Sequence, residues 1–166
     1  MMIANIRFKF LLLVIISTFY SEANSSKYNY NMQGIGAATT RTMTLNDNSK
    51  YLLYENSIGW TDNLGNYGKS FCFGRIKLRK EIAEEFNLVC ESTDQNGYKS
   101  WSEFKREDTN LKAGSGNSIY IDGTGIYKDF IGSKCIFSTN YLDDTLFFKS
   151  KCKINPEIIQ QFGRNN

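Results

Sequence analysis

Four cysteines, set in alternating patterns of apolar and polar residues, constrain the fold of this 166-residue chain more than any other feature. Successive side chains of a β-strand point to opposite faces of a sheet, so every second residue shares a face. Across residues 145–154 one face carries Leu146, Phe148, Ser150, Cys152 and Ile154. Across residues 133–141 the matching face carries Cys135, Phe137, Thr139 and Tyr141. We expect both faces to point into the core.

A hairpin that turns at residues 142–145 brings these two faces together in one register. The inward residues then pair as Cys135 with Cys152, Phe137 with Ser150, Thr139 with Phe148, and Tyr141 with Leu146. The other two cysteines follow the same rule. Their pairing aligns Cys72 with Cys90, Gly74 with Leu88, and Ile76 with Phe86.

Opposed residues in a non-hydrogen-bonded antiparallel pair have Cα atoms about 4.5 Å apart, a separation that a disulfide can bridge. Four cysteines allow three connectivities. We predict the pairs Cys72–Cys90 and Cys135–Cys152, because this connectivity alone is local and in phase in both hairpins.

The N-terminal segment has the order of a secretory signal peptide. Arg7 and Lys9 precede an unbroken apolar run at residues 10–16, and Ser21 and Ala23 are the small residues expected before a cleavage site. A membrane anchor is the alternative, but a spanning helix needs about 20 predominantly apolar residues. We therefore expect residues 1–23 to be removed and the protein to be secreted or periplasmic, where disulfides persist.

The rest of the chain has the length of one domain. Short β-favouring runs separated by Gly, Asn and Asp clusters have the spacing of an all-β sandwich or barrel. The predicted strands are residues 33–44, 50–57, 70–78, 85–93, 99–106, 117–122, 133–141 and 145–154. We predict an antiparallel eight-stranded barrel over residues 33–154, with a β-sandwich as the alternative.

Three further segments complete the predicted organisation. Residues 24–32 are polar and aperiodic, so we expect a flexible arm that contributes nothing to the core. Residues 79–86 favour a turn of helix between two strands. The tail, residues 155–166, should contain a short helix, because Pro156 occupies a favourable first helical position and Gly163 a favourable end.

Residues 123–132 contain a Gly-Thr-Gly turn, an aromatic residue at Tyr127, and a further glycine at Gly132 before the next strand. This segment resembles the allene oxide cyclase and dirigent class of barrels. The Gly-Trp-Thr-Asp loop at residues 59–62 is similar to loops in exported bacterial barrels of that type. The resemblance implies a barrel whose glycines turn sharply and whose aromatic residue closes one end. It implies no catalytic residues, because no motif in the chain matches those of the plant enzymes.

The composition excludes several classes of site. The chain has no histidine, which excludes Ser-His-Asp triads and zinc sites that contain histidine. The cysteine spacing does not fit the C-x₂-C pairs of a zinc ribbon. We expect no cofactor and no metal. Removing the signal leaves 18 basic and 16 acidic residues, a net charge of +2, so we expect no nucleic-acid partner. No later segment is apolar enough to span a membrane.

Two surface patterns have a functional and a simpler interpretation. Ser92 to Glu103 partly matches an EF-hand calcium loop, but the flanking helices are missing, so we favour a hairpin turn at residues 94–97. Basic residues line the outer face of two strands, where they could bind anionic lipid or polysaccharide, but we interpret them as a solvated surface. They are Arg75, Lys77 and Arg79 on one strand and Lys149, Lys151 and Lys153 on the other.

An eight-stranded barrel is just wide enough either to be filled by side chains or to hold one small ligand. The predicted function is non-enzymatic binding of a small apolar ligand or of an envelope partner. A cofactor-independent isomerase or cyclase, and a purely structural envelope protein, are the alternatives. The pattern does not indicate an oligomeric state. The candidate cavity wall is Ile76, Phe86, Leu88, Phe137, Thr139, Tyr141, Leu146, Phe148 and Ser150.

Overall fold

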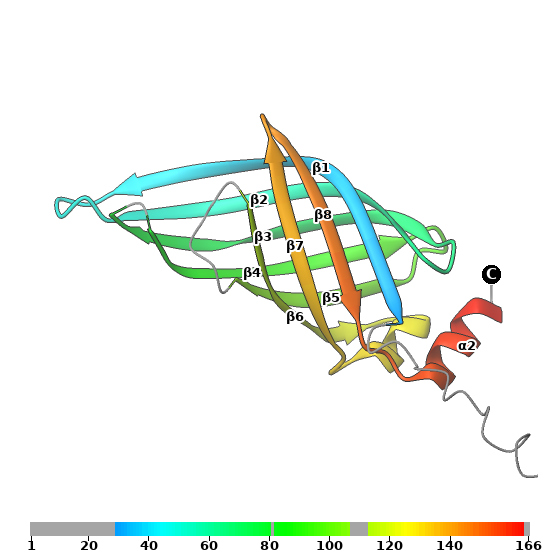
Figure 1. Cartoon of the computed structure of the whole chain (residues 1–166). Coiled ribbons are helices and arrows are strands. Elements are labelled where there is room, and N and C mark those ends of the chain that lie inside the picture. The colour runs from blue at the N-terminus through cyan, green and yellow to red at the C-terminus, as the bar shows by residue number, and fades with distance from the viewer. Residues whose placement is uncertain (1–28, 81, 107–112, 165–166) are drawn as a thin grey trace, which may run out of the picture.

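The computed structural model describes residues 29–80, 82–106 and 113–164, which form a closed antiparallel barrel of eight strands (Figure 1). Each strand pairs with the next, and β8 pairs with β1 to close the barrel. This confirms the predicted barrel and excludes the sandwich. The strands are β1 (Tyr30–Thr44), β2 (Lys50–Asp62), β3 (Tyr67–Arg79), β4 (Ile82–Asp94), β5 (Lys99–Arg106), β6 (Ala113–Gly123), β7 (Lys134–Leu142) and β8 (Thr145–Cys152).

Both cysteine hairpins have the predicted register. In the β7–β8 hairpin Cys135 lies opposite Cys152, and in the β3–β4 hairpin Cys72 lies opposite Cys90. The Cα atoms of each pair are 4.0 Å apart and the sulfur atoms are at disulfide distance. The inward residues of both hairpins also pair as predicted, because slipping either strand by one residue would turn its apolar side chains to solvent.

One end of the barrel is closed by packed aromatic rings. The 3-10 helix η2 (Gly125–Phe130) and the helix α2 (Pro156–Arg164) lie at this end (Figure 1). The ring centroid of Phe130 lies 5.3 Å from that of Tyr30, 5.4 Å from that of Tyr120 and 5.3 Å from that of Phe162. Tyr127 is also buried in this cluster. We call these five residues the aromatic plug, since together they fill the barrel end.

The start of β1 corrects the prediction of a flexible arm at residues 24–32. Tyr30 to Met32 belong to β1, and Tyr30 is completely buried. Closure of the barrel requires β1 to run along the whole of β8, and this pairs Tyr30 with Cys152. Polar residues near Tyr30 obscure the strand pattern in the sequence. In the structure they point outward or make hydrogen bonds, as Asn29 does with the backbone of Ile154. Residues 24–28 and the predicted signal peptide lie outside the described residues.

The turn between β3 and β4 also differs from the prediction. The expected helical turn over residues 79–86 is absent, because β3 continues to Arg79 and β4 begins at Ile82. A register shift after Lys77 and a left-handed conformation at Lys80 reverse the chain within a few residues. The extended conformation keeps ladder hydrogen bonds that one turn of helix would lose.

The described residues leave the opposite end of the barrel open. The turns β1–β2, β3–β4 and β7–β8 lie there, and the first four strands run well past the last four (Figure 1). Side chains from Thr39 to Thr44 are exposed on both faces of β1, because this hairpin projects beyond the barrel.

The tail helix is present as predicted, at the plugged end. No helix among the described residues is long and apolar enough to cross a membrane.

Candidate functional site

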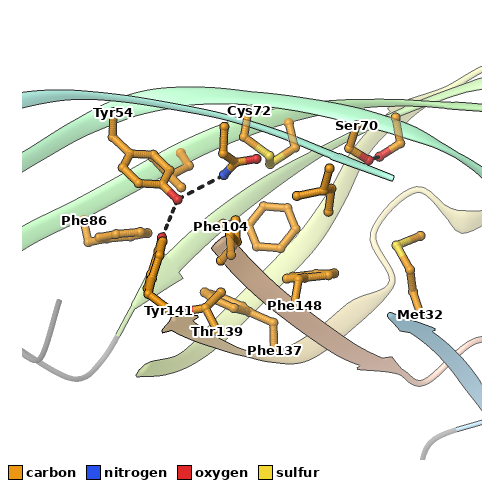
Figure 2. Close-up of a pocket in the computed structure, with 16 residues that line it drawn as sticks. Met32, Tyr54, Ser70, Cys72, Phe86, Phe104, Phe137, Thr139, Tyr141 and Phe148 are labelled. Carbon is orange, nitrogen blue, oxygen red and sulfur yellow. Dashed lines mark hydrogen bonds between the residues drawn. A yellow bond between two sulfur atoms is a disulfide. The ribbon is translucent and has the colours of Figure 1, made fainter. Parts of the chain in front are cut away.

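A small cavity lies inside the barrel, between the plug and the open end (Figure 2). Its volume is about 50 Å³. All strands except β6 contribute side chains to its wall. The lining residues are Met32, Tyr54, Asn56, Ile58, Ser70, Cys72, Phe86, Leu88, Cys90, Ser92, Phe104, Phe137, Thr139, Tyr141, Leu146 and Phe148.

The wall of this inner cavity has two chemically different sides. Phe104, Phe137 and Phe148, from β5, β7 and β8, form an aromatic side; the ring centroids of Phe104 and Phe137 are 5.1 Å apart. Figure 2 shows Ser70 and the Cys72 disulfide across the cavity from these rings. The hydroxyl oxygens of Ser70 and Ser92 are hydrogen-bonded to each other at 2.5 Å. Small polar side chains of the wall are therefore concentrated at Ser70 and Ser92 on β3 and β4, and three aromatic rings on β5, β7 and β8 lie across from them.

A hydrogen-bonded chain of three side chains crosses the cavity toward the open end. The hydroxyl oxygens of Tyr54 and Tyr141 are 2.5 Å apart, and Asn56 Nδ2 donates to the Tyr54 oxygen at 3.3 Å (Figure 2). Burial, followed by the neighbouring Tyr54, raises the pKa of the Tyr141 hydroxyl, so this group stays protonated at physiological pH. These hydroxyls join β2 to β7 across the barrel.

The amide oxygen of Asn56 has no hydrogen-bond partner among the described residues, although its side chain is buried. Leaving such an acceptor unsatisfied costs about 1–3 kcal/mol in a protein interior. An inward asparagine on β2 thus gives the cavity one acceptor that no described side chain uses.

A second space opens at the mouth of the barrel, with a volume of about 240 Å³. It shares Tyr54, Phe86 and Tyr141 with the inner cavity, so these three side chains form the partition between the two spaces. The guanidinium carbon of Arg106 lies 5.1 Å from the ring centroid of Phe86, and its Nη2 donates to the carbonyl of Ala113. The other lining residues of the mouth are Ala38, Thr40, Leu52, Ile76, Asp143 and Asp144.

The predicted wall residues divide among three places. The structure brings Phe86, Leu88, Phe137, Thr139, Tyr141, Leu146 and Phe148 together around the inner cavity. Ile76 lines the mouth instead. Ser150 points inward but lines neither space; its hydroxyl lies 3.8 Å from Cys152 Sγ, at the level of the disulfide.

Sequence reasoning missed the β2 side of the wall. Tyr54 and Asn56 lie in phase with Leu52 and Ile58, so the alternation that located the other wall residues was present there too. A polar residue within an inward apolar series was the signal that could have identified Asn56.

The two alternative surface patterns have simple structural explanations. Residues 94–97 form a hairpin turn as predicted: Asp94 Oδ1 accepts hydrogen bonds from the backbone of Asn96 and Tyr98, and Gly97 is left-handed. Within the described residues no group of three or more acidic or cysteine side chains could hold a metal ion. Each cation of the β3 basic stripe pairs with an acidic residue of β4, since Arg75 pairs with Glu85 at 2.6 Å and both Lys77 and Arg79 pair with Glu84.

Comparison of the chain with protein-family models, with curated proteins and with solved structures finds no match. The resemblance to allene oxide cyclase and dirigent barrels therefore stays a prediction. Function has to be argued from the cavity itself.

Proposed function

We propose that this protein binds a small, mainly apolar molecule inside its barrel, and that the molecule enters through the open end. The observation that carries the proposal is the composition of the inner cavity, which is apolar except for a few convergent hydrogen-bonding groups. Small-molecule sites in proteins have this composition. The aromatic plug supports the direction of entry, since it fills the opposite end.

The volumes indicate how such a molecule would fit. The inner cavity of about 50 Å³ is smaller than an engineered protein cavity of roughly 150 Å³ that binds benzene. A ligand larger than a few atoms therefore has to use the mouth as well. Tyr54, Phe86 and Tyr141 stand between the two spaces, so movement of the Phe86 ring would join them into one site and leave the Tyr54–Tyr141 hydrogen bond in place.

The chemistry of the inner wall favours binding over the alternative isomerase or cyclase activity. Its titratable groups are the phenols Tyr54 and Tyr141, since its cysteines are paired. A general base works best when its pKa lies near the operating pH. Burial moves the pKa of Tyr141 in the opposite direction, upward, so this phenol holds its proton. A phenol that keeps its proton, as Tyr141 does, can position a ligand but is poorly suited to remove a proton from it.

The proposed place of action is outside the cytoplasm. The signal-like segment at residues 1–23 and the two cysteine pairs at disulfide distance both support export, because disulfides persist in oxidising compartments.

Native mass spectrometry of the protein purified gently from its own host tests the proposal. We expect the wild type to carry a small molecule that organic extraction removes. Leu146→Phe should abolish this binding, because Leu146 lines the inner cavity and a phenyl ring there occupies the ligand space. Leu78→Phe is the matched control, because Leu78 is equally buried but lines neither space. The proposal fails if the wild type carries no molecule and no small apolar compound raises its melting temperature.

A further inference from the structure

The hydrogen-bonding groups of the inner cavity specify more than an apolar ligand. Asn56 is 8% exposed, lines the cavity, and has an amide oxygen without a partner among the described residues. The Ser70 and Ser92 hydroxyls of the same cavity are hydrogen-bonded to each other. Among the residues that line the cavity, the buried acceptor without a partner is the Asn56 oxygen, on β2.

The hydrogen bond between Tyr54 and Tyr141 leaves one phenolic proton unused. Tyr54 and Tyr141 have two phenolic protons, and the hydrogen bond between them uses one, whichever tyrosine donates. The Tyr54 oxygen already accepts a hydrogen bond from Asn56 Nδ2. The second phenolic proton is therefore available to a further acceptor. The cluster of Tyr54, Asn56 and Tyr141 thus offers one donor and one acceptor to a molecule in the cavity.

We infer that the ligand carries a hydroxyl group on an otherwise apolar body, and that this hydroxyl binds to the Tyr54–Asn56–Tyr141 cluster. This inference rests on the proposed binding function. A hydroxyl both donates and accepts, so it can satisfy the Asn56 oxygen and the remaining phenolic proton together. Phe104, Phe137 and Phe148 would contact the apolar body, because they form the opposite side of the wall.

Other polar groups fit this cluster less well. A carbonyl can accept the phenolic proton but offers nothing to the Asn56 oxygen. A carboxylate or an ammonium group would be buried without an opposite charge, since the lining residues of the inner cavity include neither cations nor anions. The cluster therefore selects a neutral group that is both donor and acceptor.

Phenol and toluene are suitable probes, because they have nearly the same shape and differ by a hydroxyl in place of a methyl group. We would measure the dissociation constants of both by isothermal titration calorimetry and calculate the phenol-to-toluene affinity ratio. In Asn56→Leu this ratio should fall by about tenfold relative to the wild type, the size expected when a buried polar group loses its partner. The ratio cancels any general effect of the substitution on cavity shape.

Asn140→Leu is the matched control, because it makes the same chemical change away from the cavity. Asn140 is exposed on the outer face of β7. Its ratio should equal that of the wild type. The double variant Tyr54→Phe/Tyr141→Phe provides a second test, since it removes both phenolic protons and keeps both rings; its ratio should also fall.

The outcomes separate the two proposals. If phenol does not bind the wild type, the hydroxyl assignment is wrong; the binding function itself fails only if no small apolar compound raises the melting temperature of the wild type. If both bind and the ratio is unchanged in Asn56→Leu and in Tyr54→Phe/Tyr141→Phe, the hydroxyl assignment is wrong, while binding in the barrel stands. A lower ratio in both variants, with Asn140→Leu unchanged, supports the assignment.

Discussion

Alkaline pH should unfold this protein abruptly, because three of its tyrosines are buried and a fourth, Tyr141, is partly buried, which opposes their ionisation. Burial is the largest cause that raises the pKa of Tyr30, Tyr120, Tyr127 and Tyr141. The first three lie in the aromatic plug and the fourth forms the partition between cavity and mouth. Alkaline pH should therefore destabilise both the aromatic plug and the partition, the two features that define the proposed site.

The magnitude follows from proton linkage. A tyrosine in the unfolded chain ionises near pH 10, whereas these four keep their protons in the folded barrel. Their contribution to stability is complete below pH 10 and is lost as the pH rises above it. Each such tyrosine lowers the free energy of unfolding by about 1.4 kcal/mol per pH unit, so the four together remove roughly 5 kcal/mol per pH unit. Single domains are stable by about 5–15 kcal/mol, so unfolding should be complete within a few pH units above pH 10.

A rapid pH titration that follows tyrosinate absorbance and far-ultraviolet circular dichroism together measures this effect. We expect these four tyrosines to ionise in one cooperative step that coincides with loss of β-structure. Tyr141→Phe should reduce the slope of unfolding free energy against pH by the contribution of one proton. Tyr67→Phe, at an exposed position, should not change this slope. Gradual ionisation of all tyrosines in a barrel that keeps its circular dichroism would refute the reasoning.

Three further predictions concern stability, each measured by chemical denaturation at neutral pH. Gly36→Ala should lose about 1–3 kcal/mol because its Cβ would collide with the backbone of β2, whereas Gly59→Ala meets no atom and should change stability by less than about 0.5 kcal/mol. Phe162→Ala should lose roughly 3–5 kcal/mol, because Phe162 is buried in the plug. Replacing Cys135 and Cys152 together by alanine should lose about 3 kcal/mol, since their disulfide would close a short loop.

The sequence determined register better than it determined strand ends. Register was predictable because four cysteines and their inward neighbours had to share one phase, and a slip of a single residue would have exposed all of them. The start of β1 was not predictable in the same way. Tyr30 is buried only because η2 and α2, distant in sequence, bring Phe130 and Phe162 against it.

The candidate site was predictable in its apolar half only. Phe137 and Phe148 follow the phase of the cysteines, so their inward direction could be inferred from local pattern. Whether the space between them is filled depends on what the opposite strands supply. The answer depends on contacts between β2 and β7, which are distant in sequence. No local pattern indicates that Tyr54 and Asn56 lie beside Tyr141 in the closed barrel.

The cavity exists because small residues occupy inward positions where larger ones would fill the barrel. Ser70 and Ser92 face inward on β3 and β4, and Gly74 takes the inward position opposite Leu88. The phenylalanines of β5, β7 and β8 extend from the other wall, but they pack against one another and leave a space before the serines. Interiors are otherwise packed nearly as densely as organic crystals, so a gap with a polar side is a specific feature of this sequence. Small polar residues in the inward phase of consecutive strands are therefore the sequence pattern that indicates a site in a barrel of this size.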